Sequence, residues 1–228
     1  MNNMSCGASH LDRPRIFACF ALLSALLSVG LLAVIVQSVS LDPAALLAHM
    51  TDHLRDIIID AVVALSWAVF SIPFIVGLRE LLRPKSPGLA LAAVVLSASG
   101  VLLLGYGMRM SAGAELAILA TGGPSFGAET LLEVAFWRFL SYTLADPGLM
   151  TWGLGQLLFG WLAWRSSVLP NWLAIIGIVD GFAGLFTDAV YQTPILALPQ
   201  VACFSVWGFF TAAILVRHRA VTREPSPA

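Results

Sequence analysis

Six apolar segments, each close to the length of a membrane-spanning helix, divide this 228-residue chain. A bilayer hydrocarbon core about 30 Å thick requires roughly 20 apolar residues in helical conformation to cross it. A helix also satisfies all of its backbone hydrogen bonds internally, as lipid demands. We therefore expect an all-α polytopic bundle with six transmembrane helices. The segments are residues 16–38, 57–78, 89–108, 149–164, 172–190 and 197–216.

The composition excludes several other classes of protein. Hydrophobic residues make up 59% of the chain and charged residues only 11%, against roughly a quarter in soluble domains. So few charges cannot cover the surface of a soluble enzyme of this size, and a disordered chain would be more polar. The net charge of −1 gives no basic face for a nucleic acid. The expected partner is the lipid bilayer, and nucleic acid is not expected to bind.

The basic residues orient the predicted bundle. If six spans alternate in direction, nine Arg and Lys residues fall on the side of both termini and three on the other. Cytoplasmic loops carry the excess of Arg and Lys, so both termini should be cytoplasmic. We predict a cytoplasmic segment at 1–15, a transmembrane domain at 16–217 and a disordered cytoplasmic tail at 218–228. The nine residues are Arg13, Arg15, Arg79, Arg83, Lys85, Arg165, Arg217, Arg219 and Arg223.

Residues 129–145 form an apolar stretch that carries Glu133 and Arg138. It is followed by Asp146-Pro147-Gly148, a combination that commonly breaks a helix. We predict a separate amphipathic helix at the outer face of the membrane. The alternative is one long, tilted helix that continues through the fourth span.

A stripe of possible metal ligands precedes the second span. His49, His53, Asp56 and Asp60 follow at helical positions i, i+4, i+7 and i+11, which share one face. Two histidines one turn apart can hold one divalent metal, although a zinc site needs a third ligand. The alternative is a solvated face of an interfacial helix. Carboxylates that can complete the site are Asp188, Glu129 and Glu133.

Polar residues within the spans are the other candidates for function. Asp180 lies near the middle of the fifth span, where a charged side chain is costly and often functional. Gly177-x-x-x-Gly181 around it is a motif for close helix packing. Gln156 lies near the middle of the fourth span, where it can hydrogen-bond to Asp180. Either Asp180 binds a ligand in a groove, or it is a structural residue that joins two helices.

The segment 154–177, LGQLLFGWLAWRSSVLPNWLAIIG, carries a family resemblance. Its Phe-Gly pair, the span that ends in Arg-Ser, the following Leu-Pro and the glycine-rich next span resemble a bacterial family of six-helix membrane proteins of uncharacterised function. Asp60, with the apolar span that follows it and ends in a Leu-Arg-rich turn, is similar to that family as well. The resemblance implies a multi-pass protein of the bacterial plasma (inner) membrane. It supplies no activity and no catalytic residues.

Three functional hypotheses follow. The first is a membrane protein that binds or conducts a small ligand, ion or lipid, with Asp180, Gln156, Asp60 and Asp188 lining a polar cavity. The second is a metal-dependent membrane enzyme whose outer site uses His49, His53 and Asp56. The third is a structural subunit, which stabilises a partner membrane protein or a homo-oligomer through its faces of small residues.

Overall fold

A computed structural model describes residues 13–39, 54–121, 128–186 and 197–221, and the structural statements below concern these residues. Within these ranges the chain forms α-helices joined by short turns, without strands, so the all-α prediction is confirmed. The described helices are α1 (Arg13–Val39), α3 (Leu54–Leu82), α4 (Pro87–Thr121), α5 (Ala128–Ser166), α6 (Asn171–Leu185) and α7 (Ala197–Val221).

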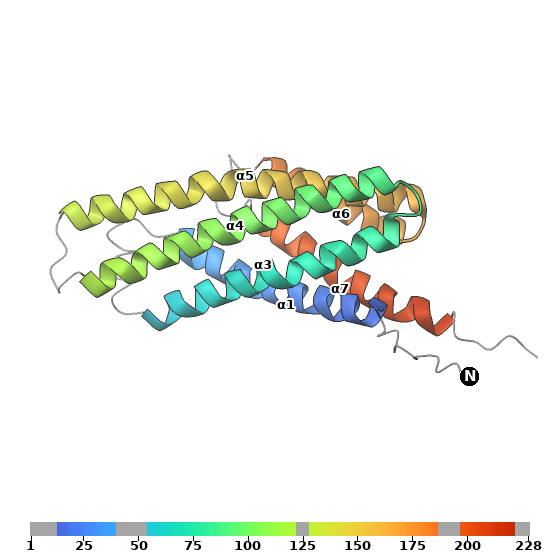
Figure 1. Cartoon of the computed structure of the whole chain (residues 1–228), viewed down its shortest axis with the longest axis horizontal. Helices are drawn as coiled ribbons and strands as arrows, with labels where there is room; N and C mark the ends of the chain where they lie inside the picture. The colour runs from blue at the N-terminus through green and yellow to red at the C-terminus, as the bar shows by residue number, and fades with distance from the viewer. Residues whose placement is uncertain (1–12, 40–53, 122–127, 187–196, 222–228) are drawn as a thin grey trace, which may run out of the picture.

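The six described helices run alternately up and down the long axis of the bundle (Figure 1). The α3–α4 turn, the α5–α6 turn, the start of α1 and the end of α7 all lie at the same end. Each helix packs against the next described helix in the chain, and α7 packs back against α1. The helices therefore close a ring in chain order. The α4–α5 hairpin extends past the other helices at the opposite end (Figure 1).

Among the described residues, three helices are long and apolar enough to cross a membrane. These spans are Ile57–Leu82 in α3, Pro87–Met110 in α4 and Pro199–Val216 in α7, and they coincide with three of the six predicted ones. The apolar parts of α1 and α6, Arg15–Leu31 and Asn171–Leu185, are shorter. In α5 the glycines, the tryptophans and Gln156 lower the hydropathy of the predicted fourth span. The protein is thus a helical membrane bundle.

The helix break expected at Asp146-Pro147-Gly148 is wrong, because α5 continues from Ala128 to Ser166. The segment predicted as a separate interfacial helix is the first half of α5. It packs along α4, where the Ser141 hydroxyl donates a hydrogen bond to the Gly107 carbonyl at 2.8 Å. At Gly148 the helices are so close that a Cβ atom would lie 2.8 Å from the backbone nitrogen of Leu104. Such packing against a neighbour allows a transmembrane helix to continue through proline.

The centre of the bundle is filled by aromatic side chains from α3, α5 and α7. Their rings meet mostly edge to face, with centroids 5.0 Å apart for Trp152 and Phe204 and 5.2 Å apart for Trp67 and Trp152. Aromatic pairs prefer this geometry because the positive ring edge meets the negative face. We call this set the aromatic cluster; its members are Trp67, Phe74, Trp152, Phe159, Phe204 and Trp207.

Buried hydroxyl groups join α1 to α3. The Trp67 indole N–H donates to the Ser28 hydroxyl at 2.7 Å, and the hydroxyls of Ser24 and Ser71 lie 2.6 Å apart. Ser28 in turn donates to the carbonyl of Ser24 at 2.8 Å. These bonds satisfy polar groups that lipid could not, so they fix the position of Trp67 in the aromatic cluster.

Candidate functional site

Glycines make the contact between α5 and α6. This contact determines where the predicted polar residues of the two helices lie. A Cβ atom on Gly184 of α6 would lie 2.8 Å from the Cα of Gly153 on α5. At the other end of the contact, a Cβ on Gly160 would lie 2.6 Å from the backbone nitrogen of Ile178. The two backbones therefore touch, as small residues permit in membranes. Gly177 also packs on Gly160, so the predicted packing motif serves a helix of the same chain.

Helix α7 lies across this glycine contact. The side-chain nitrogen of Gln200 would lie 2.7 Å from a Cβ on Gly184, and the Trp207 ring would lie 3.1 Å from a Cβ on Gly177. Trp207 also meets Phe159 of α5, with ring centroids 6.3 Å apart. One face of α7 therefore contacts both α5 and α6.

Asp180 and Gln156 lie at this junction of α5, α6 and α7. On α6, Asp180 comes three residues after Gly177 and four before Gly184, the two glycines that contact α7. On α5, Gln156 comes between Gly153 and Gly160, the two glycines that contact α6. Both side chains are completely buried. We call this place the junction site, with members Asp180, Gln156, Gln200 and Trp207.

The polar atoms of the junction site are buried without hydrogen-bond partners among the described residues. They are both carboxylate oxygens of Asp180, the side-chain oxygen and nitrogen of Gln156 and of Gln200, and the indole nitrogen of Trp207. The anticipated hydrogen bond between Gln156 and Asp180 is therefore not formed. An unsatisfied buried polar group costs about 1–3 kcal/mol, and more when it is charged. A cluster of such groups is unusual and requires an explanation.

The junction site contains oxygen atoms that can act as ligands for a cation, and the segments that build it supply no basic side chain. Residues 139–164, 171–185 and 197–216, which build the site and its surroundings, contain no Arg or Lys. The carboxylate of Asp180 and the amide oxygens of Gln156 and Gln200 are hard ligands, of the kind that bind small cations.

The remaining predicted site residues have side chains whose positions are outside the described part of the chain. His49, His53 and Asp188 lie outside the described residues, and so do the side chains of Asp56 and Asp60 on α3. Within the described part of the chain, no group of three His, Cys, Asp or Glu residues could hold a metal ion. The metal site therefore stays a prediction.

Gln200 and Trp207 were not among the predicted site residues. The sequence carries a signal for both, because Gln200, Phe204 and Trp207 follow at i, i+4 and i+7 and so share a helix face. A glutamine within a membrane span is a candidate functional residue, as an aspartate is, because its amide also needs a hydrogen-bond partner in lipid.

The ring of apolar helices and its buried polar junction define the class of this molecule: an all-α polytopic membrane protein. The chain belongs to the family described as "Domain of unknown function (DUF4386)", whose model matches residues 18–219. This agrees with the resemblance to an uncharacterised family of membrane proteins. No curated protein and no solved structure matches the chain.

Proposed function

We propose that this protein binds a small cation within the membrane, at the junction site, and that the cation exchanges with a proton on Asp180. The observation that carries the proposal is the complete burial of a carboxylate whose two oxygens have no partner among the described residues. Burying an isolated charge is far more costly than burying a paired one. A bound cation or a proton removes that cost.

Both glutamines support a cation as the ligand. Gln156 and Gln200 each offer an amide oxygen from a different helix, and both side chains are buried. Together with Asp180, the site presents oxygen atoms from α5, α6 and α7. Coupling-ion sites of secondary transporters also lie near the middle of the bilayer. Conduction of the cation across the bilayer is the natural extension of this proposal.

Thermal unfolding of the purified protein in detergent tests the proposal. Chlorides of lithium, sodium and potassium are compared at constant ionic strength, with choline chloride as the salt of a cation too large for the site. A ligand that binds only the folded state at 100 times its Kd stabilises it by about 2.7 kcal/mol. For a chain of this size that corresponds to a rise in Tm of about 5–10 °C.

The decisive comparison is between Asp180→Asn and Asp146→Asn. The first variant keeps the shape of the side chain and removes the charge of the junction site, so its Tm should no longer depend on the cation. The second removes a carboxylate elsewhere on α5 and should respond like the wild type. If Asp180→Asn and wild type respond alike to every salt, the cation does not bind at Asp180. The Tm of the wild type is measured in each salt at an acidic and at an alkaline pH. If no small cation raises this Tm above its value in choline at either pH, the proposal fails.

A further inference from the structure

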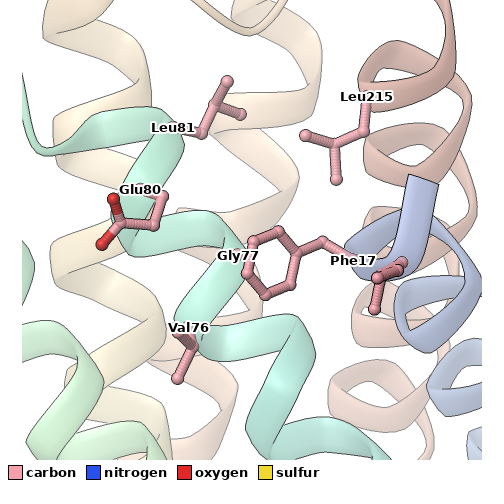
Figure 2. A pocket seen from close by; sticks show the side chains of 7 residues that line it. Phe17, Val76, Gly77, Glu80, Leu81 and Leu215 are labelled. Carbon is pink, nitrogen blue, oxygen red and sulfur yellow. The ribbon is translucent and has the colours of Figure 1, made fainter. Parts of the chain in front are cut away.

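A groove of about 570 Å³ opens between α1, α3 and α7, at the end of the bundle where α1 begins and α3 ends (Figure 2). The Phe17 ring of α1 lies against Gly77 of α3, where a Cβ atom would be 2.8 Å from the Cγ of Phe17. Leu81 of α3 and Leu215 of α7 lie on either side of the remaining space (Figure 2). The groove is therefore apolar in its depth, and its volume is typical of a small-molecule site.

Charged side chains gather at the same end of α3. Glu80, which lines the groove, pairs with Arg79 at 2.6 Å between Oε1 and Nη1. The second oxygen of Glu80 lies 4.0 Å from Nη1 of Arg83, whose side chain is 56% exposed. Lys85 follows in the exposed α3–α4 turn. Three basic residues and one carboxylate thus lie at this end of α3, which leaves a net positive charge at the end of the helix that lines the groove.

Arg79 has further hydrogen-bonding capacity. Its Nε atom is buried and out of reach of a ligand, but its side chain is 28% exposed, so a ligand would contact the terminal part of the guanidinium. A guanidinium presents its donors in a planar fork that matches a phosphate group. Arg79 and Arg83 are one turn apart on α3, so a single phosphate can accept hydrogen bonds from both.

We propose that this groove binds an anionic phospholipid, with an acyl chain between Leu81 and Leu215 and the headgroup phosphate at Arg79 and Arg83. An apolar groove next to a net positive charge matches both parts of such a molecule. Basic pockets between transmembrane helices are known to take anionic headgroups. Glu80 opposes the phosphate, and it pairs with both arginines.

Native mass spectrometry of the full-length protein tests this proposal. The protein is equilibrated with equal amounts of phosphatidylglycerol, phosphatidylethanolamine and phosphatidylcholine of the same acyl chains. We expect preferential retention of phosphatidylglycerol, and about fivefold weaker retention in Arg83→Gln, the value for one basic residue near an anionic headgroup. Equal retention of all three lipids would overturn the proposal, and so would unchanged retention of phosphatidylglycerol by Arg83→Gln.

Three further variants sharpen the test. Leu215→Trp fills the groove and should abolish the preference, whereas Val216→Trp, at the adjacent and 53% exposed position, should leave it unchanged. Glu80→Gln removes the opposing charge and should increase retention of phosphatidylglycerol. A decrease in Glu80→Gln together with preference for phosphatidylethanolamine would show recognition of the amine instead, and would overturn the proposal. If Leu215→Trp does not fold, Arg83→Gln and Glu80→Gln decide the question.

Discussion

Gln200 of α7 packs directly on Gly184 of α6, with its amide nitrogen 2.7 Å from the place where a Cβ atom would lie at position 184. On the other side of Gly184, the same Cβ atom would lie 2.8 Å from the Cα of Gly153 on α5. Position 184 therefore has no room for a methyl group. Glycine at this position allows α5, α6 and α7 to approach this closely. The junction site exists because the glycines of α5 and α6 let the backbones touch.

The first prediction concerns Gly184→Ala. The added methyl group must push α5 and Gln200 apart, and overpacking of this kind typically costs 1–3 kcal/mol. We expect the free energy of unfolding to fall by about that amount in denaturant titration of detergent-solubilised protein. The matched control is Gly113→Ala on α4, where nothing lies within 4 Å of the added atom. It should be neutral or gain up to about 1 kcal/mol from helix propensity. Equal stability of the two variants would contradict the close contact.

The second prediction concerns the hydrogen bond from the Trp67 indole to the Ser28 hydroxyl. A double-mutant cycle of Trp67→Phe and Ser28→Ala isolates its contribution. Polar contacts between transmembrane helices average about 0.6 kcal/mol, with a maximum near 1.7 kcal/mol. We expect a coupling energy in the upper half of that range, because both groups are buried. A coupling of zero in unfolding measurements would show that the bond does not stabilise the fold.

The third prediction concerns the aromatic cluster. Phe204 is completely buried and its ring meets Trp67, Phe74 and Trp152. Removal of a buried phenylalanine side chain costs about 3–5 kcal/mol, so Phe204→Ala should be strongly destabilising. Phe182→Ala is the control, because Phe182 is 52% exposed on the bundle surface and should be nearly neutral. Comparable losses in thermal unfolding would show that Phe204 is not part of the core.

The fourth prediction concerns the continuity of α5. Spin labels at Leu132 and Met150, two exposed positions on either side of Pro147, measure the length of the helix between them. Eighteen residues of unbroken helix place their Cα atoms about 27 Å apart. Electron–electron distance measurements should give a single population near that value, broadened by the labels. A markedly shorter distance would mean that the chain breaks at Asp146-Pro147-Gly148 after all.

The length and composition of the apolar segments predicted where the described helices lie, and local signals at single residues predicted less. Pro147 with its neighbours is a strong break signal in an isolated segment, yet α5 passes through it. The reason is that α5 packs against α4 on both sides of Pro147, through the hydrogen bond of Ser141 and the close backbone contact at Gly148. Contacts between helices are not visible in the residues of one segment, and here they outweigh its local preference.

The candidate site, too, could be predicted only in part from the sequence. Asp180 and Gln156 were identifiable because polar side chains are rare in membrane spans. The bond expected between them is absent from the structure, in which the side-chain atoms of both lack partners among the described residues. Gln200 and Trp207 belong to the junction site only because α7 lies across the contact of α5 and α6. That placement depends on how three helices pack, and no single segment contains it.

The sequence by itself determined the class of the protein and where its apolar helices lie along the chain, because the hydrophobic effect and backbone hydrogen bonding act on each segment separately. The tertiary structure alone decided which polar residues meet, that the ring closes between α1 and α7, and that a groove remains between α1, α3 and α7. These features follow from the fit of glycines against neighbouring backbones and of large rings against one another, and such fit arises only when the helices are assembled.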